Sequence, residues 1–334
     1  MGVVLQFVIN GLMSGAIYAL IAIGIVAVYK STRVVNFAHG YVIMIGAYLY
    51  YTFAVLMADV PWLPAWYAAW EPQWLLDQRA GAQMFSVEKA WLDWLSNLPR
   101  IVIGLILAII FSSFLAMGIE RYTMRPLLGQ SSFAMIMVTV GLISVLSGIK
   151  GILWTGDAAS VPHLAPNPPI RFELFDTPIF IFGANLVSMI IALVVFAGIV
   201  LWIRYSSAGV SIRAASEDQS TAYSMGIDVT SVFRTAWIIA AATGAIAGAI
   251  LAARDGVSPS LGLFGFSVLA IVLMGGLDSF IGVLIASFVV GIIEALVQWQ
   301  LGGGWVEVTP YIAVLIVILI RPHGLFGQQE VERI

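Results

Sequence analysis

Few residues in the apolar parts of this chain could take part in chemistry. Glu294 is the one charged residue between positions 279 and 306, and His39 is the one histidine that lies in an apolar stretch near the start of the chain. An ionised carboxyl group in hydrocarbon costs roughly 2.5–3.5 kcal/mol on insertion scales, so we expect Glu294 to face a bundle interior or a wet cavity. Two roles stay open for it: part of a solute path, or a structural hydrogen bond to a neighbouring helix. For His39, a neutral imidazole bonded to a backbone group is the simpler expectation.

Motifs for catalysis are absent from the sequence. No HExxH or GxSxG pattern occurs, and the segment 24–31 ends in Lys-Ser but has Tyr29 where a Walker A loop needs glycine. Because the chain has no cysteine, it has no thiolate metal ligand and no cysteine nucleophile. We therefore expect no enzymatic reaction, no metal and no cofactor in this chain. If ATP drives its function, ATP and magnesium belong to other subunits.

The composition indicates that a membrane surrounds these residues. The chain of 334 residues is 61% hydrophobic and 10% charged, whereas soluble domains average about 25% charged residues. A helical span needs about 20 apolar residues, and nine apolar windows follow one another: 2–29, 34–58, 101–119, 126–149, 177–203, 235–253, 256–277, 279–306 and 308–320. The sequence predicts an all-α, polytopic transmembrane bundle of eight or nine spans, forming one domain over residues 1–334. Because the seventh window is rich in glycine and the ninth is short, one or both should be tilted, broken or partly re-entrant.

Positively charged residues between the windows predict the orientation. Cytoplasmic connections of membrane proteins are enriched in Lys and Arg. Basic residues follow the first, third, fifth and ninth windows: Lys30 and Arg33, then Arg121 and Arg125, then Arg204, Arg213 and Arg234, then Arg321 and Arg333. This pattern predicts a bacterial inner-membrane protein with the N-terminus outside and the C-terminus in the cytoplasm. The net charge of −3 and the lack of a long basic run argue against nucleic acid as a partner, and membrane lipid is the expected surrounding.

Two connections face outward in this topology. The connection over residues 59–100 holds six of the eleven tryptophans, four of them at every fourth position: Trp62, Trp66, Trp70 and Trp74. On a helix these four would form one aromatic stripe, which is typical of a helix lying in the membrane interface. A docking surface for a partner is the alternative. The second connection, over residues 154–182, has five prolines and should follow an extended, turn-rich path.

Small residues at helical spacing occur in several windows. They are the pairs Gly11/Gly15 and Gly244/Gly248 and the stripe Ser144, Ser147, Gly148 and Gly151. Helices in lipid associate by close backbone approach, so we interpret these residues first as packing faces. A solute path through the bundle is the second interpretation, and its candidate residues are Asn36, His39, Thr139, Ser144 and Glu294. One Glu and one His make a poor proton relay, which argues against a secondary carrier.

The longest inward connection covers residues 204–234. Within it, small apolar residues alternate with polar ones over residues 213–226, which predicts a short amphipathic helix ended by Gly226. Its charged residues are Arg213, Glu217 and Asp218. On the cytoplasmic face such a helix would serve as a handle for a soluble motor subunit, or it would simply connect two spans.

Seven short motifs occur in an order that resembles the permeases of high-affinity branched-chain amino acid ABC import systems, of the LivH type. The motifs are Asn10-Gly11 with Gly15 and Tyr18-Ala19-Leu20; Asn36-Phe37-Ala38-His39-Gly40 with Gly46-Ala47-Tyr48; Arg125-Pro126-Leu127; Arg213-Ala214 with Glu217-Asp218, Ala222 and Gly226-Ile227; Gly275-Gly276-Leu277 with Ser279; Gly291 to Glu294; and Arg321-Pro322 with Gly324-Leu325-Phe326-Gly327. The resemblance covers nearly the whole chain. Asp278 departs from the pattern, since glycine is common there in the family, and the 59–100 connection is long.

The resemblance implies a type II importer architecture. In such an assembly this chain would form the translocation path with a second homologous permease, and two cytoplasmic ATPase subunits would bind ATP and magnesium. An extracytoplasmic solute-binding protein would deliver the solute. The segment from Arg213 to Gly226, with Glu217 and Asp218, would be the helix that couples the permease to the ATPase. Branched-chain or other amino acids are the implied substrates; urea, short amides and aromatic acids are carried by related permeases and stay open.

Overall fold

The computed structural model of this protein describes residues 2–59, 63–64, 67, 71–81, 87–127, 129–155, 158–174 and 177–327. Within these residues, seven helices are long and apolar enough to cross a membrane. They are α1 (Gly2–Thr32), α2 (His39–Ala54), α5 (Val87–Ile119), α6 (Ser132–Leu153), α7 (Gly183–Tyr205), α10 (Val229–Asp255) and α12 (Phe280–Leu301). Two shorter apolar helices, α11 (Leu261–Gly275) and α13 (Thr309–Ile320), correspond to the seventh and ninth apolar windows. The predicted helix bundle is confirmed, and the two segments expected to be irregular are the two short helices.

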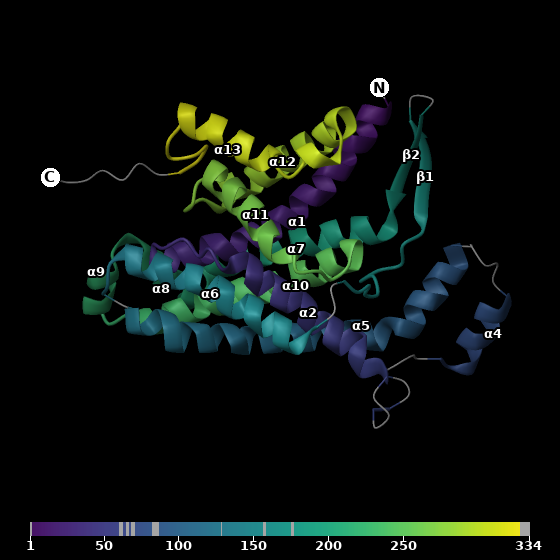
Figure 1. Cartoon of the computed structure of the whole chain (residues 1–334), viewed down its shortest axis with the longest axis horizontal. Helices are drawn as coiled ribbons and strands as arrows, with labels where there is room; N and C mark the ends of the chain where they lie inside the picture. The colour runs from purple at the N-terminus through teal and green to yellow at the C-terminus, as the bar shows by residue number, and fades with distance from the viewer. Residues whose placement is uncertain are drawn as a thin grey trace.

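Smaller elements join these helices. They are α4 (Gln73–Gly81), α8 (Ser207–Glu217) and α9 (Gln219–Ser224), the strands β1 (Pro169–Leu174) and β2 (Thr177–Phe182), short 3-10 turns at Leu56–Asp59, Arg125–Leu127 and Gly303–Trp305, and a π-helical turn at Glu120–Met124. The two strands pair in antiparallel register, with Ile170 opposite Ile181. Figure 1 shows this hairpin standing at the same end of the bundle as the N-terminus, while α9 lies at the opposite end.

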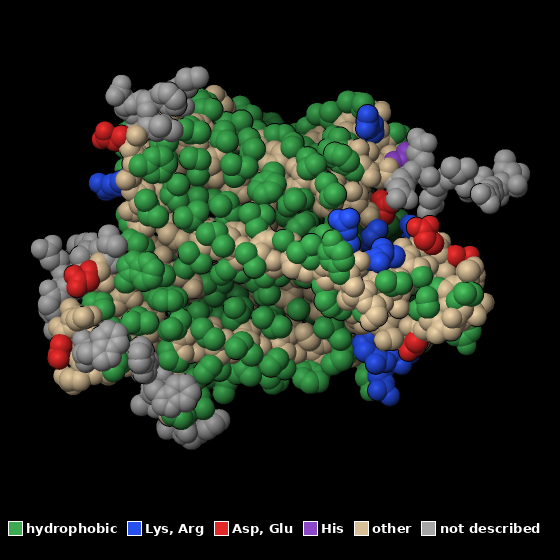
Figure 2. Space-filling model, turned by 180° about the vertical axis from the view of Figure 1, so that it is seen from behind, with side chains coloured by type: hydrophobic (Ala, Val, Ile, Leu, Met, Phe, Trp, Pro, Cys, Tyr) green, Lys and Arg blue, Asp and Glu red, His purple; other side chains and the backbone are tan. Residues whose placement is uncertain are grey.

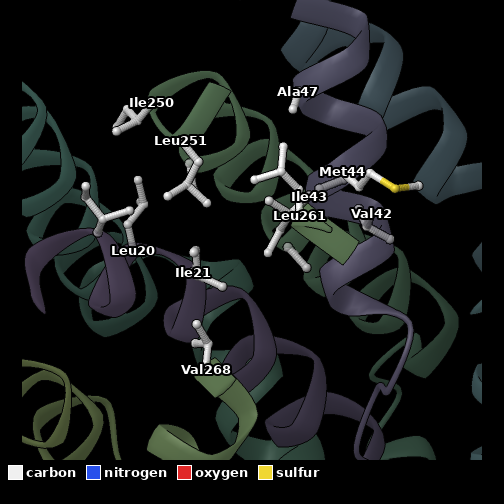
Figure 3. Packing of buried hydrophobic residues seen from close by; sticks show 14 of the residues in the cluster. Leu20, Ile21, Val42, Ile43, Met44, Ala47, Ile250, Leu251, Leu261 and Val268 are labelled. Carbon is white, nitrogen blue, oxygen red and sulfur yellow. The ribbon is translucent and has the colours of Figure 1, made fainter. Parts of the chain in front are cut away.

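Helix α1 lies at the centre of the bundle. It packs most extensively against α12, α10 and α7, and it crosses the middle of the molecule in Figure 1. Figure 3 shows Leu20 and Ile21 of α1 facing Leu251 of α10 and Val268 of α11 in the apolar core. Because these side chains are fully or almost fully buried in the single chain, the core does not depend on lipid for its packing.

Close backbone contact between α1 and α12 is made possible by glycine. A Cβ atom added at Gly11 would lie 2.6 Å from the carbonyl oxygen of Gly291, and one added at Gly15 would lie 2.8 Å from that of Ser287. Gly248, in the second predicted pair, approaches Ile43 of α2 in the same way. The interpretation of both glycine pairs as helix-packing faces is therefore confirmed.

The small-residue stripe of α6 behaves differently. Ser144, Ser147, Gly148 and Gly151 are all exposed, and a Cβ atom added at either glycine would meet nothing within 4 Å. Among the residues that the structure describes, this stripe packs against none of the other helices. The expected helix contact is thus not made within this chain, because α6 turns its opposite face, with Leu142 and Leu146, toward the core.

Side-chain hydrogen bonds to the backbone occur at both ends of the bundle, and the two ends differ in charge. At the hairpin end, which carries β1, β2 and the start of α1, the side chain of Gln6 exchanges two hydrogen bonds with the backbone of Phe180. At the α9 end, which carries α8, α9 and the end of α1, Lys30 donates to the carbonyl oxygen of Asp278 at 2.8 Å. The basic residues used to predict orientation and described by the structure lie toward the α9 end, where most of the blue side chains of Figure 2 gather beside an apolar surface.

One predicted outward connection and the start of the fifth apolar window need correction, whereas the extended path expected for residues 154–182 is seen in the strands β1 and β2. Residues 87–100 are not loop, because α5 begins at Val87: the charges of this segment end the apolar window but leave helical hydrogen bonding intact. Residues 177–182 form strand β2 and not the start of a span, since a short apolar run does not distinguish strand from helix. The aromatic stripe falls outside the described residues: Trp62, Trp66 and Trp70, and the side chain of Trp74.

Candidate functional site

The predicted coupling segment is built from two helices and not one. Helix α8 ends at Glu217, and Asp218 adopts an extended backbone conformation (φ −152°, ψ 114°) between α8 and α9. Its carboxylate accepts hydrogen bonds from the backbone N–H groups of Ser220 at 2.7 Å and Thr221 at 3.0 Å. An aspartate in this position starts a new helix, so the predicted single amphipathic helix is broken at Asp218.

The end of α9 matches the prediction. Gly226 has a positive φ of 85°, and the N–H of Ile227 donates to the carbonyl oxygen of Ala222 at 3.0 Å. This is a glycine-dependent helix end, which a residue with a Cβ atom would strain. Gly226 therefore contributes a backbone conformation to this segment, and no side-chain contact.

The α8–α9 element has a buried face and an exposed tip. Ile212, Ala215 and Ala222 pack with Val232 of α10 in a small cluster of their own. At the tip, the side chains of Tyr223 and Met225 are 74% and 79% exposed. Two large side chains therefore stand exposed at the tip of this element. Both residues lie in the 213–226 segment singled out in the sequence, but the pattern drew no attention to Tyr223.

Two of the three predicted charged residues bond to backbone groups within or next to this element. The guanidinium of Arg213 donates to the carbonyl oxygen of Ile203 and so ties α8 to the end of α7. Hydrogen bonds from Thr221 and Ser220 hold the pKa of Asp218 at about 2, below its ordinary value. Glu217 is exposed at the end of α8, so it is the predicted residue whose carboxylate faces outward.

Helix α1 is joined directly to the α8–α9 element. Nε of Arg33 donates to the carbonyl oxygen of Ser216 at 2.8 Å. Nε2 of Gln219 donates to the carbonyl oxygen of Ser31 at 3.2 Å. Side chains from both sides of the junction thus tie α8–α9 to the end of α1.

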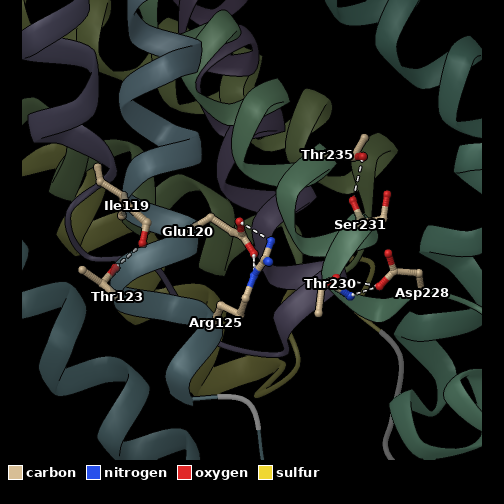
Figure 4. Close-up of polar contacts among 8 residues, drawn as sticks. All are labelled: Ile119, Glu120, Thr123, Arg125, Asp228, Thr230, Ser231 and Thr235. Atoms are coloured by element: carbon tan, nitrogen blue, oxygen red, sulfur yellow. Dashed lines mark hydrogen bonds and ion pairs between the residues drawn. The ribbon is translucent and has the colours of Figure 1, made fainter.

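The turn from α5 to α6 contains a buried ion pair near the same end. Glu120 is fully buried, and Nε and Nη2 of Arg125 each lie 3.2 Å from one of its carboxylate oxygens. Figure 4 shows this pair beside the start of α10, where Asp228 accepts a hydrogen bond from the N–H of Thr230 at 3.0 Å. The pair compensates the buried carboxylate charge and fixes the π-helical turn.

Three of the predicted path residues lie close together near the start of α2. Nε2 of His39 is 3.2 Å from the carbonyl oxygen of Ile21, the backbone contact that was expected. Asn36 accepts from the N–H of Ala38 at 3.0 Å, and the hydroxyl of Thr139 donates to the carbonyl oxygen of Ile136 at 2.8 Å.

These three side chains do not line a space for a solute. Asn36 and Thr139 border a cavity of about 10 Å³, which is enough for one water molecule at most. His39 is 1% exposed. In this conformation the three residues therefore bond to nearby backbone, while Ser144 of the predicted path lies on the exposed face of α6.

Glu294 is hydrogen-bonded inside the bundle, as expected. The hydroxyl of Tyr18 donates to Oε2 of Glu294 at 2.5 Å, and both side chains are buried. The ring of Tyr18 also lies 5.4 Å, centroid to centroid, from that of Phe264. This contact joins α1, α11 and α12. The sequence analysis named Glu294 but missed Tyr18, which is the group that satisfies its carboxyl.

Comparison with known proteins gives a consistent picture. Residues 7–320 match the family described as "Branched-chain amino acid transport system / permease component". The chain is 28% identical to the high-affinity branched-chain amino acid transport system permease protein LivH of Escherichia coli (strain K12), over 99% of this chain and 97% of that protein. It is 27% identical to BraD of Pseudomonas aeruginosa, over 99% and 98% of the two chains.

Two further similarities are more limited. The permease protein LivM of Salmonella typhimurium is 28% identical over 47% of this chain and 36% of that protein. Among solved structures, PsaBC from Streptococcus pneumoniae in complex with Fab aligns with 95% of this chain and 92% of that chain, at a TM-score of 0.44 and 14% identity. The family match covers almost every helix described above, so this chain belongs to the family of permease components of branched-chain amino acid transport systems.

Proposed function

We propose that this chain is a permease subunit of an ATP-binding-cassette importer for branched-chain or chemically related amino acids. The observation that carries the proposal is the family match over residues 7–320, together with relatives that are named as branched-chain amino acid permeases and align over nearly their full length. The chain contributes the membrane path and hydrolyses no ATP itself.

The proposed assembly has a second homologous permease, two cytoplasmic ATPase subunits and an extracytoplasmic binding protein. The similarity of half of this chain to LivM supports a homologous partner, because LivM and LivH both carry the name of a permease of the same kind of system. The hairpin end then faces outward and the α9 end faces the cytoplasm. The excess of Lys and Arg at the α9 end supports that orientation.

In this proposal α8–α9 is the contact for an ATPase subunit. Its exposed tip, with Tyr223 and Met225, would enter an apolar groove, and its buried cluster would keep the two helices in place. ATP-driven closure of the ATPase pair would move α8–α9, and the bonds from Arg33 and Gln219 would pass that movement to α1.

Uptake into proteoliposomes tests the proposed function. The permease pair, the ATPase subunits and the binding protein are reconstituted together, and uptake of labelled leucine is followed with ATP inside or outside. We expect uptake that requires ATP on the α9 side and the binding protein on the hairpin side. Leucine uptake by this chain without ATPase subunits would indicate a carrier or channel instead.

A pair of variants tests the ATPase contact. Tyr223→Ala combined with Met225→Ala should reduce co-purification of the ATPase subunits by roughly 10-fold or more, because apolar anchors dominate such interfaces. Tyr122→Ala is the matched control, since Tyr122 is 78% exposed but lies outside α8–α9. Equal co-purification for the double variant and the parent would place the ATPase contact elsewhere.

A further inference from the structure

Polar side chains form a single line along the first half of α1. The hydroxyl and amide side chains between positions 2 and 28 are Gln6, Asn10, Ser14 and Tyr18, and no others occur there. A spacing of four places them on one face of the helix. Gln6 and Ser14 are half-buried and Asn10 is exposed, whereas Tyr18 is buried in its bond to Glu294. The line therefore runs from the hairpin end inward and stops at the Tyr18–Glu294 bond.

The outer three members of this line border a cavity of about 550 Å³. Six of its lining residues carry amide, hydroxyl or guanidinium groups: Gln6, Asn10, Ser14, Asn185, Arg254 and Gln298. They come from α1, α7, α10 and α12, so four helices meet around it. Sites for small molecules are typically about 300–1,000 Å³ in volume, and this cavity is large enough for an amino acid.

Arg254 is the one positively charged residue among the described residues that line this cavity. It is the last but one residue of α10; its Nη1 donates to the hydroxyl of Ser14 at 3.2 Å, and its Nε lies 3.1 Å from Oδ2 of Asp255. No described residue accepts a hydrogen bond from Nη2. About a third of the side chain is exposed. One face of the guanidinium is therefore held in place by the protein, while another nitrogen remains able to bind a ligand.

The carboxylate of Asp255, which pairs with Arg254, borders a different cavity. Asp255 is 54% exposed and lines a second cavity, of about 670 Å³, with Ser258, Ser267 and Glu307. A positive and a negative group thus stand side by side at the end of α10. An amino acid carries the same two charges, a carboxylate and an ammonium group, and guanidinium groups bind carboxylates in a planar, directional manner.

We propose that the cavity bordered by the polar line of α1 is a transient binding site for the transported amino acid, with Arg254 binding its carboxylate. The identity of the solute rests on the proposed function, while the cavity, the polar line and the charge are properties of this chain. The Tyr18–Glu294 bond lies further inward along the same line of α1 and does not border the cavity. This places the solute contact at the hairpin end, and not among Asn36, His39 and Thr139.

Cysteine labelling tests the site, because the chain has no cysteine of its own. Ser14→Cys is made in the reconstituted importer, with the other subunits also free of cysteine, and is labelled with a membrane-impermeant thiol reagent from the binding-protein side. We expect labelling that leucine slows in a concentration-dependent way and that isopentylamine, which lacks the carboxylate, does not slow. Leu12→Cys is the control, since Leu12 lies outside the polar line on the same helix, and its labelling should not respond to leucine.

The role of Arg254 is tested in the same background. Arg254→Gln should raise the leucine concentration needed for protection of Ser14→Cys by roughly 10-fold or more, because a charge-assisted hydrogen bond is lost. No labelling of Ser14→Cys, or equal protection with and without Arg254, would overturn the proposal. If Ser14→Cys does not assemble, Asn10→Cys replaces it.

Failure of the two proposals can be told apart. Without any ATP-dependent leucine uptake by the parent assembly, the proposed function is wrong. With normal uptake by the parent and an unchanged concentration dependence in Arg254→Gln, the importer is real and the site is wrong.

Discussion

Polar side chains at the α9 end bond mainly to backbone groups, either in their own element or in a neighbouring helix. Arg213 bonds to the end of α7, and Asp218 bonds to the first turn of α9. The same holds within the bundle for His39 and Thr139, which bond to backbone carbonyl groups. A polar residue that is a candidate for function in the sequence can therefore have a structural role in the fold, as a hydrogen-bond partner of the backbone.

Asp218 offers a test of this distinction. Asp218→Ala removes the acceptor for the N–H groups of α9, so amide exchange over residues 219–224 should become faster and leucine uptake should fall. Asp218→Asn keeps an acceptor oxygen and should behave like the parent. Loss of uptake in both variants, with normal exchange in both, would show that the charge contacts a partner.

The pH dependence of α9 follows from the same group. The folded pKa of Asp218 is about 2 and lies below the value of about 3.9 for an unfolded chain. A depressed pKa means that the carboxylate stabilises α9 fully above about pH 4, and that this contribution is lost as the pH falls toward 2. The parent should lose protection of residues 219–224 over that range relative to Asp218→Asn; parallel curves for the two would contradict the assignment.

Glu294 and Tyr18 form the buried polar contact whose loss should matter most. Glu294→Gln keeps a group that can accept from the hydroxyl of Tyr18 and should assemble normally. Glu294→Leu leaves that hydroxyl without its partner, and Tyr18→Phe does the same to the carboxyl, so both should lower uptake. Uptake per assembled complex is the measurement. Parent-like uptake in Glu294→Leu would mean that this bond has no part in transport.

At the scale of helices, close approach between α1 and α12 fixes the core of the bundle. The methyl group of Gly11→Ala would meet the backbone of Gly291, which is not free to move aside. We expect this single carbon to lower the yield and thermal stability of the detergent-solubilised protein. Gly148→Ala on α6 is the matched control, because its methyl group would meet nothing. Equal melting temperatures for the two variants would show that α1 and α12 can move apart to accommodate a methyl group without lowering the stability of the protein.

At the scale of the whole molecule, α8–α9 and the cavity bordered by the polar line of α1 lie at opposite ends, and α1 contacts both. Arg33→Gln combined with Gln219→Ala removes the side-chain bonds between α1 and α8–α9. ATPase subunits should still bind this variant and hydrolyse ATP, while uptake per ATP should fall. Ser224→Ala is the control, because Ser224 lies in the same helix and its hydroxyl donates to the carbonyl oxygen of Ser220, within α9 itself. If the ratio of leucine uptake to ATP hydrolysis did not change, these bonds would have no part in coupling the ATPases to transport.

Hydropathy predicted much of this architecture, because burying a charge in lipid is costly and every span is therefore poor in charged residues. The nine apolar windows correspond to nine apolar helices, and the basic residues near Lys30 and Arg204 predicted that the ends of α1 and α7 lie at the same end of the bundle. It could not detect the break at Asp218 or the strand at residues 177–182, which depend on local backbone bonding. It also could not tell which face of α6 is covered, so Ser144 and Thr139 looked equivalent although one is exposed and the other buried.

The length of α1 has a mechanical consequence. With 31 residues, its axis measures about 46 Å. As a stiff rod held near one end by Arg33 and Gln219, it would act as a lever. A rotation of about 10° at that end would sweep the opposite end through about 8 Å, close to the distance between the axes of two packed helices. A modest stroke of the ATPases would thus be enlarged with distance along the rod, and the outermost polar residue, Gln6, would travel furthest while Tyr18 moved least among the four.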